Sequence, residues 1–182
     1  AISGQKLHHM LWTYKVKSFG LKKARICLDG RQQDPSTYDN IHSPTMRLTS
    51  LRILLSLAAR HSWDIFADDA AQAFLNAPRP EDKPLFTSYP IGYRSPGHCL
   101  LLKRMLYGLH DAPMGWYTTV RQHLVEDQGF KVSTTDESLF VKPGVFVVVH
   151  VDDFCSTGEP AAVADFRKQL HARFDMTGGP ID

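Results

Sequence analysis

The sequence predicts an α+β fold in which a small antiparallel sheet is backed by helices. Apolar and alternating segments typical of strands occur among amphipathic helical segments, in the order helix, strand, helix, strand, strand, helix, behind a β-rich front section. The 182 residues are 43% apolar and 22% charged, an ordinary globular composition. This length allows one substantial core or two small lobes.

The front of the chain is expected to form a basic β-hairpin. Residues 11–17 alternate, Ser18-Phe19-Gly20 follow as a turn, and residues 24–28 form the second strand. Residues 6–31 hold seven lysines and arginines against Asp29, a net charge of +6, whereas the whole chain carries only +2. The charge fits an anionic partner or a solvated hairpin edge, and both readings stay open.

The first helix and the strand after it follow a polar connection. Thr49 or Ser50 is expected to cap a helix that runs to about Arg60, and a strand from Trp63 to Asp69 comes next. The expected apolar stripe of the helix consists of Leu51, Leu54, Leu55 and Ala58.

The middle of the chain is rich in proline. Five prolines between residues 76 and 97 exclude a helix there and indicate extended chain with short strands. Residues 100–103 look like another short strand. Pro113 then opens a helix over about residues 114–127, and Gly129 ends it.

The last third alternates strands and a final helix. A strand over residues 137–141 is followed by an apolar strand that starts at Val145. The final helix is expected from about Pro160 to Phe174, with Gly178-Gly179 ending it. Its apolar face consists of Val163, Phe166, Leu170 and Phe174.

Acidic side chains end two of the predicted strands. Asp69 closes the earlier strand, and Asp152 and Asp153 follow the apolar run from Val145. Buried carboxylates cost several kcal/mol unless a cation or hydrogen-bond donors meet them. If the two strands are neighbours, Asp69 and Asp152 converge on a site suited to hard divalent cations. The other reading is that the Asp-Asp pair forms a hairpin turn and that Asp69 caps the following segment.

Other chemistries lack a matching pattern. Cys27, Cys99 and Cys155 show no C-x-x-C spacing, and the nine histidines include no H-E-x-x-H motif, so zinc is not indicated and a reducing compartment is expected. No membrane-spanning run or export signal is seen, so we expect neither export nor membrane insertion. The first residue is not methionine, and we expect an excerpt of a longer polypeptide.

Several motifs occur in an order that resembles the reverse transcriptase of copia-type long-terminal-repeat retrotransposons. The motifs are Lys23-Ala24-Arg25, Ser43-Pro44, Asp69-Ala70-Ala71-Gln72-Ala73-Phe74-Leu75-Asn76, Leu106-Tyr107-Gly108-Leu109, Ala112-Pro113, Trp116-Tyr117, Ser138-Leu139-Phe140 and Val151-Asp152-Asp153. The resemblance implies a right-hand polymerase fold, with fingers at residues 1–48 and 78–110 and palm at residues 49–77 and 111–182. A thumb and a ribonuclease H domain are expected to be absent from this chain.

The resemblance also implies residue roles. Asp69, Asp152 and Asp153 would bind two Mg²⁺ ions, with Mn²⁺ as a substitute, and Asp69 and Asp152 would bridge both ions. Lys23 and Arg25 would bind the incoming triphosphate.

Further roles concern the sugar, the template and the primer. Phe74 would lie under the sugar and exclude a 2′-hydroxyl, although from its position alone it reads as a core residue. Tyr107 and Gly108 would pack against nucleotide and template. His150 stands where many relatives have tyrosine, at a position that contacts the primer end. Trp116 and Tyr117 are expected in the core.

Two further departures from the family pattern change the charge. Asp68 replaces a usual apolar residue; pointing inward it would raise the pKa values of its neighbours, and pointing outward it would be harmless. His110-Asp111 replaces a more basic and amide-bearing pair, which removes positive charge near the template path.

The function expected is an RNA- or DNA-templated DNA polymerase that adds deoxynucleotides to a primer. Its partners would be primer-template, deoxynucleoside triphosphates and the rest of a retrotransposon polyprotein, with no membrane. Without a thumb, weak binding and low activity are expected. A domesticated nucleic-acid-binding module without turnover and a metal-dependent nuclease or phosphatase are the alternatives. The oligomeric state stays open.

Overall fold

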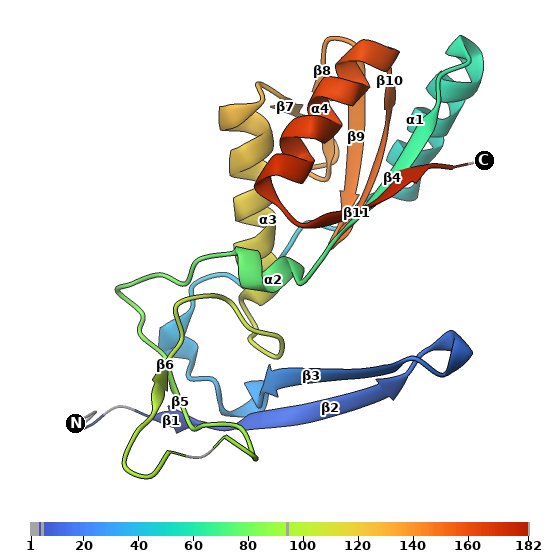
Figure 1. The fold of residues 1–182 in the computed structure, drawn as a ribbon. Coiled ribbons are helices and arrows are strands. Elements are labelled where there is room, and N and C mark those ends of the chain that lie inside the picture. Colours follow the sequence, from blue (N-terminus) through green and yellow to red (C-terminus); the bar gives the residue numbers. More distant parts are fainter. Residues whose placement is uncertain (1–3, 5, 94, 182) are drawn as a thin grey trace. The chain divides into compact units, whose positions relative to one another are not determined.

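The computed structural model describes residue 4, residues 6–93 and residues 95–181 (Figure 1). The chain forms two compact units, each built from segments that are distant in the sequence. The first unit comprises residues 1–42 and 74–115, and the second comprises residues 43–73 and 116–182.

The first unit contains the expected hairpin and a second small sheet. Strands β2 (Met10–Val16) and β3 (Lys22–Leu28) pair antiparallel, which confirms the hairpin. Strand β5 (Phe86–Thr87) pairs parallel with β1 (Leu7–His8) and antiparallel with β6 (Leu100–Leu101). The sixth strand is therefore two residues shorter than the sequence indicated.

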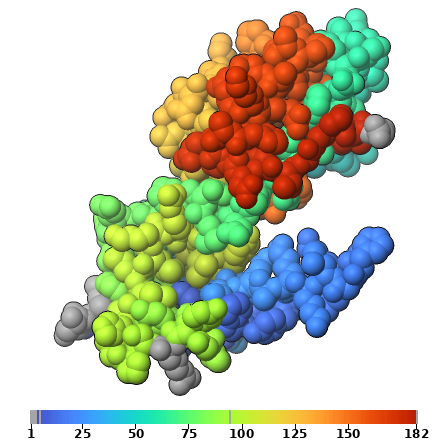
Figure 2. All heavy atoms as spheres, in the orientation of Figure 1, coloured from blue at the N-terminus to red at the C-terminus, as the bar shows by residue number. Residues whose placement is uncertain are grey.

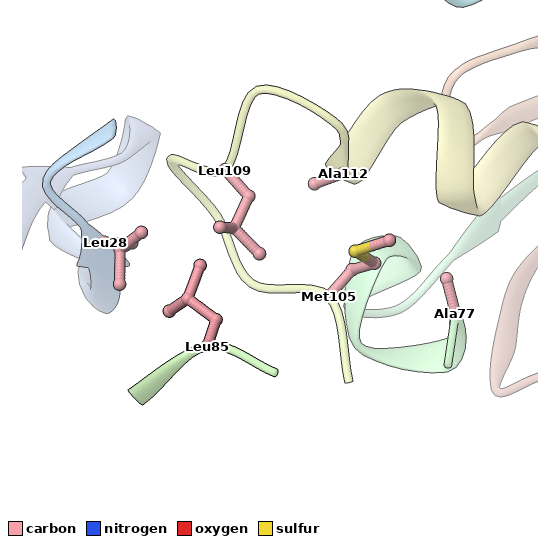
Figure 3. Packing of buried hydrophobic residues seen from close by; sticks show 6 residues of the cluster. All are labelled: Leu28, Ala77, Leu85, Met105, Leu109 and Ala112. Atoms are coloured by element: carbon pink, nitrogen blue, oxygen red, sulfur yellow. The ribbon is translucent and has the colours of Figure 1, made fainter. Parts of the chain in front are cut away.

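The core of the first unit is an aliphatic cluster at the base of the hairpin. Figure 3 shows its side chains, which come from the end of β3, the proline-rich stretch, the segment before helix α3 (Ala112–Gln122) and the first residue of that helix. The cluster consists of Leu28, Ala77, Leu85, Met105, Leu109 and Ala112, each at most 4% exposed. Phe74, in the short helix α2 (Ala73–Asn76), packs against this cluster but stays partly accessible.

The second unit is built on an antiparallel six-stranded sheet in the order β11-β4-β10-β9-β8-β7. Its strands are β4 (Ile65–Ala70), β7 (Lys131–Val132), β8 (Leu139–Lys142), β9 (Val145–His150), β10 (Asp153–Gly158) and β11 (Met176–Pro180). Strand β10 separates β4 from β9, so the conditional placement of the Asp69 strand directly beside the Val145 strand is wrong. The strand between them is β10, the second strand of the hairpin that begins with β9.

Helices pack against this sheet (Figure 1). They are α1 (Leu48–His61), α3 (Ala112–Gln122), which continues as a π-helical turn over His123–Asp127, and α4 (Pro160–Arg173). Helix α4 contacts β9 and β10 and buries Val163, Phe166 and Leu170, as its periodicity predicted. In α1, Leu54 and Ala58 are buried, but Leu55 is 40% exposed, so the predicted stripe is narrower.

The start of α1 differs from the expectation. Arg47 is the N-cap and no side chain caps the helix, so the prediction of Thr49 or Ser50 as cap is wrong. The Ser50 hydroxyl instead donates to the buried carboxylate of Asp136, which also accepts from the backbone N–H groups of Arg47 and Ser138. Burial raises the pKa of Asp136, but these donors outweigh it and leave the pKa below its ordinary value.

Gly178 and Gly179 lie in strand β11 and do not end α4, so that prediction is also wrong. Gly178 pairs with Asp68 of β4 and has φ = +142°. A Cβ atom at Gly178 would lie 2.1 Å from the carbonyl oxygen of Ala67. Glycine at this position lets β11 lie against the strand that carries Asp69.

Aromatic side chains dominate the core of the second unit. Trp116, Phe130, Phe140, Phe154 and Phe166 are each at most 2% exposed, and Tyr117 is 8% exposed, so both predicted core residues of α3 are confirmed. The α+β class, with an antiparallel sheet backed by helices, is confirmed. Across the described residues, no helix combines the length and apolar character that a membrane span requires.

Candidate active site

Strands β4 and β10 bring two of the predicted carboxylates together. Asp69 of β4 lies directly opposite Asp153 of β10 in the antiparallel register. Opposite residues project to the same face, with Cβ atoms about 5 Å apart. Both residues are exposed. The register thus places Asp69 opposite Asp153, whereas the convergence expected from the sequence was between Asp69 and Asp152.

Asp152 lies in the two-residue turn that joins β9 to β10. Its carbonyl oxygen accepts a 2.8 Å hydrogen bond from the N–H of Ala70, the last residue of β4. The neighbouring Val151 carbonyl accepts a 2.6 Å bond from Nε1 of Trp116 in α3. These two bonds hold the turn beside the end of β4, so the backbone of Asp152 is fixed next to the Asp69 strand.

The turn stores backbone strain. Val151 has φ = +57°, a conformation that a β-branched residue rarely adopts. Such a residue costs of order 1–3 kcal/mol and persists when its surroundings hold it in place. The buried Trp116 ring, 1% exposed, provides that restraint through its hydrogen bond.

The acidic groups influence one another electrostatically. The pKa of Asp153 lies above its ordinary value, first because neighbouring protein atoms partly desolvate this exposed residue and then because of the negative charges of Asp152 and Asp69, with His150 acting in the opposite sense. Such a group of like charges gains from a bound cation, and carboxylate oxygens are the donors that Mg²⁺ prefers. Among the described residues, no three histidine, cysteine, aspartate or glutamate side chains are already grouped to hold a metal ion.

Asp68 points away from these carboxylates. It alternates with Asp69 along β4, is 2% exposed, and accepts hydrogen bonds of 2.8 and 2.7 Å from Arg167 on α4. His171, one turn later on α4, lies 3.1 Å from the same carboxylate. Asp68 is thus on the opposite face from Asp69, where it is neutralised by a paired arginine.

Arg25, Tyr107 and Phe74 form a second group of predicted residues, within the first unit. The Arg25 guanidinium lies 5.4 Å above the Tyr107 ring, and the Phe74 ring is 5.0 Å from that ring. Lys23 is two residues before Arg25 on β3 and shares its face. The structure therefore places the Arg25 cation and two aromatic rings together, with Lys23 on the same face of β3, and Phe74 both packs on the core and contacts Tyr107.

Gly108 lets two backbone segments meet. Its φ is +92°, and a Cβ atom there would lie 2.1 Å from the Leu28 carbonyl oxygen. The Leu28 N–H donates a 2.7 Å bond to the Tyr107 carbonyl oxygen. Glycine at this position thus joins the Tyr107 segment to the end of β3, which carries Arg25.

A buried polar network lies in the same unit, and the sequence reasoning missed it. Arg79 is 5% exposed and donates to Asp111 at 3.3 Å and to the Thr37 carbonyl at 2.8 Å. Gln33 donates to Asp111 at 3.0 Å and accepts from the His110 N–H at 2.7 Å. The charge of Asp111 is therefore paired inside the unit. The only sign of this network in the sequence is weak, namely that Arg79 lies between two prolines.

Comparisons with known proteins agree with the motifs. Residues 3–179 match the family described as "Reverse transcriptase (RNA-dependent DNA polymerase)". The chain is 36% identical over 163 residues to the Retrovirus-related Pol polyprotein from transposon RE1 of Arabidopsis thaliana, covering 85% of this chain and 11% of that protein. It is 28% identical to the Pol polyprotein from transposon TNT 1-94 of Nicotiana tabacum, covering 91% and 13%.

The chain spans only about a tenth of the length of these relatives. Among solved structures, it resembles the foamy viral protease-reverse transcriptase in complex with double-stranded DNA, with a TM-score of 0.47 and 17% identity over 95% of this chain and 26% of that one. The family match covers nearly the whole chain. The chain belongs to the reverse transcriptase (RNA-dependent DNA polymerase) family, in its copia-type retrotransposon branch.

Proposed function

We propose that the chain is the fingers-and-palm part of an RNA-directed DNA polymerase, which adds deoxynucleotides to the 3′ end of a primer on an RNA or DNA template. The fingers are residues 1–48 and 78–110 and the palm is residues 49–77 and 111–182, bounds that differ by a few residues from those of the first and second units. The observation that carries the proposal is the pairing of Asp69 with Asp153, with Asp152 tied by its backbone to the end of the same strand.

The three carboxylates are the groups that would hold two Mg²⁺ ions, or Mn²⁺ in their place. Asp69 and Asp152 would be the main ligands of these ions, and Asp153 would be a more peripheral one. When bound, such ions activate the attacking hydroxyl and stabilise the leaving pyrophosphate. The raised pKa of Asp153 supports this assignment, because a cation relieves the repulsion that contributes to it.

The nucleotide is bound by the residues that cluster in the first unit. Lys23 and Arg25 contact the triphosphate, and the Tyr107 ring orients the Arg25 guanidinium through the contact at 5.4 Å. Phe74 contacts the sugar and excludes a 2′-hydroxyl by its bulk. The Tyr107-Gly108 backbone packs against nucleotide and template.

The remaining assignments concern the protein's surroundings. His150, exposed and opposite Asp153 in the hairpin register, contacts the primer end. The chain works as part of a longer retrotransposon polyprotein, inside the cell, in a cytoplasmic particle or the nucleus.

Single-nucleotide incorporation on a labelled primer tests the chemistry without requiring processive synthesis. RNA and DNA templates are compared, with Mg²⁺ or Mn²⁺, for the wild-type chain and Asp152→Asn. The matched control is Asp64→Asn, an exposed carboxylate just before β4. We expect incorporation by the wild type and by the control, and a loss of at least 100-fold in Asp152→Asn, in line with the removal of one strong electrostatic group.

Incorporation that survives Asp152→Asn would refute the proposal. Binding of primer-template without incorporation by the wild type would favour a domesticated binding module. Release of shortened nucleic acid without nucleotide addition would favour a nuclease that uses the same carboxylates.

A further inference from the structure

Two buried aromatic rings contact each other in the interior of the second unit. Trp116 of α3 and Phe174, which directly follows α4, are 1% and 3% exposed. Their ring centroids are 5.1 Å apart, and the rings meet edge to face with an angle of 73° between their planes. In Figure 2 the atoms of α3 and α4 form adjoining parts of the surface of the second unit, and the two rings lie beneath it. We call these two residues the aromatic pair.

Trp116 is connected to the turn between β9 and β10. Its Nε1–H donates to the Val151 carbonyl at 2.6 Å, and the adjacent Asp152 carbonyl accepts from the Ala70 N–H at 2.8 Å. Ala70 directly follows Asp69 in β4. The indole N–H therefore helps to fix the position of the turn relative to the Asp69 carboxylate.

Phe174 is connected to the other side of β4, where β11 pairs with it. The next residue, Asp175, accepts a 2.8 Å hydrogen bond from the Ala71 N–H through its carbonyl oxygen. Ala70 and Ala71 are the two residues that follow Asp69. The backbone after Asp69 is therefore bonded on both sides to segments that the aromatic pair contacts or carries.

The strain at Val151 gives the indole hydrogen bond its importance. His150 pairs with Asp153, so the turn has two residues and Val151 is its first central residue, with φ = +57°. Glycine is the residue preferred at such a position. Without the indole N–H, the turn can relax to negative φ, which moves Asp152. The strain usual for such a residue corresponds to a change in population of about 5- to 150-fold.

We propose that Trp116 is a positioning residue, whose indole N–H holds the strained turn so that Asp152 stays beside Asp69, and that Phe174 keeps the indole ring in place. The inference rests on the proposed function, because the same carboxylates would bind the metal ions. It adds two residues that contact neither metal nor substrate. The carboxylates bind divalent cations with full affinity only while the indole N–H keeps Val151 at positive φ.

Binding of Mn²⁺ alone, measured by the electron paramagnetic resonance signal of the free ion, tests the proposal without primer or nucleotide. Trp116→Phe keeps a ring, removes the N–H and should weaken binding by about 5- to 150-fold. Phe174→Leu removes the edge-to-face contact and should weaken it by about 2- to 12-fold. Tyr117→Phe is the matched control, because it removes a buried hydrogen bond to the Glu137 carbonyl from the next position of α3, and it should change the affinity less than twofold.

Val151→Gly provides a rescue that a purely structural role of Trp116 would not give. Glycine adopts positive φ without strain, so the turn keeps its conformation without the indole N–H. Trp116→Phe combined with Val151→Gly should bind Mn²⁺ within threefold of Val151→Gly alone. In single-nucleotide incorporation, Trp116→Phe should need more Mn²⁺ for half-maximal rate and should reach a similar rate at saturating Mn²⁺.

Hydrogen exchange of the Ala70 amide separates this proposal from the polymerase proposal. This N–H is bonded to the Asp152 carbonyl, so its protection reports the position of the turn in the absence of metal. Trp116→Phe should speed its exchange by about 5- to 150-fold, and Tyr117→Phe should change it less than twofold. This pattern in a wild type that neither binds Mn²⁺ nor incorporates nucleotides would refute the polymerase proposal and support the positioning of the turn by Trp116.

Three outcomes would overturn the proposal. The first is a folded Trp116→Phe, as judged by thermal melting followed by circular dichroism, in which Mn²⁺ affinity and Ala70 exchange both change less than twofold. The second is an equal effect of Tyr117→Phe, which would indicate general destabilisation. The third is an effect of Trp116→Phe that Val151→Gly does not reduce. If Trp116→Phe does not fold, the same measurements on Phe174→Leu decide.

Discussion

Replacing Arg167 by methionine should destabilise the second unit, because it leaves the buried carboxylate of Asp68 without its main partner. The Asp68 side chain is 1% exposed and the Arg167 side chain 20% exposed, and two hydrogen bonds of 2.8 and 2.7 Å join them. Removing one partner of a buried pair costs about 3–5 kcal/mol. His171 remains 3.1 Å from Asp68 and water reaches part of Arg167, so we expect about 2–4 kcal/mol.

Urea unfolding followed by tryptophan emission measures this cost. Trp116 is buried in the second unit, and a Trp12→Phe background removes the tryptophan of the hairpin. Lys168→Met is the matched control, because Lys168 is exposed and adjacent to Arg167 on the same helix. The control should change the free energy of unfolding by less than about 0.5 kcal/mol, as is usual for surface substitutions.

A double variant separates the ion pair from other effects. Asp68→Leu combined with Arg167→Met replaces the pair by apolar side chains, which is often neutral or stabilising for a buried pair. The double variant should therefore be more stable than Arg167→Met alone. The reasoning is wrong if Arg167→Met costs no more than Lys168→Met, or if the two single costs simply add in the double variant.

Three further predictions concern acid stability, strand packing and sugar selection. The pKa of Asp136 is depressed in the folded state, so its charge contributes stability that is complete above the ordinary aspartate pKa and is lost as pH falls through the lower folded pKa. The wild type should therefore lose stability below about pH 4, and Asp136→Asn should lose less over that range. Thermal melting at several pH values measures both. Gly178→Ala should lower the free energy of unfolding, measured in urea, by more than about 1 kcal/mol, because the added Cβ would lie 2.1 Å from the Ala67 carbonyl oxygen. Gly179→Ala should lower it by less, because a Cβ at that position meets no atom within 4 Å. Phe74→Ala should lower the preference for deoxyribonucleotides over ribonucleotides in single-nucleotide incorporation, and an unchanged preference would assign Phe74 to the core alone.

Local pattern in the sequence determined the secondary structure of much of this protein. The β2–β3 hairpin follows from alternation and a glycine turn, and α4 follows from a helical period of buried residues that begins at Pro160. The apolar run from Val145 became a buried strand as its composition predicted. These features depend on neighbours a few positions away, which a sequence shows directly. The order of the motifs along the chain also indicated the family.

Tertiary structure alone decided which strands pair and which charges are neutralised. Asp69 and Asp153 lie opposite each other because β10 pairs with β4, an arrangement that no local pattern encodes. Asp68 finds Arg167 99 positions later in the chain, and Gly178 becomes part of a strand because β4 offers it a free edge. Burial and pairing depend on contacts between distant segments, so the energies that decide them appear only when the whole unit has folded.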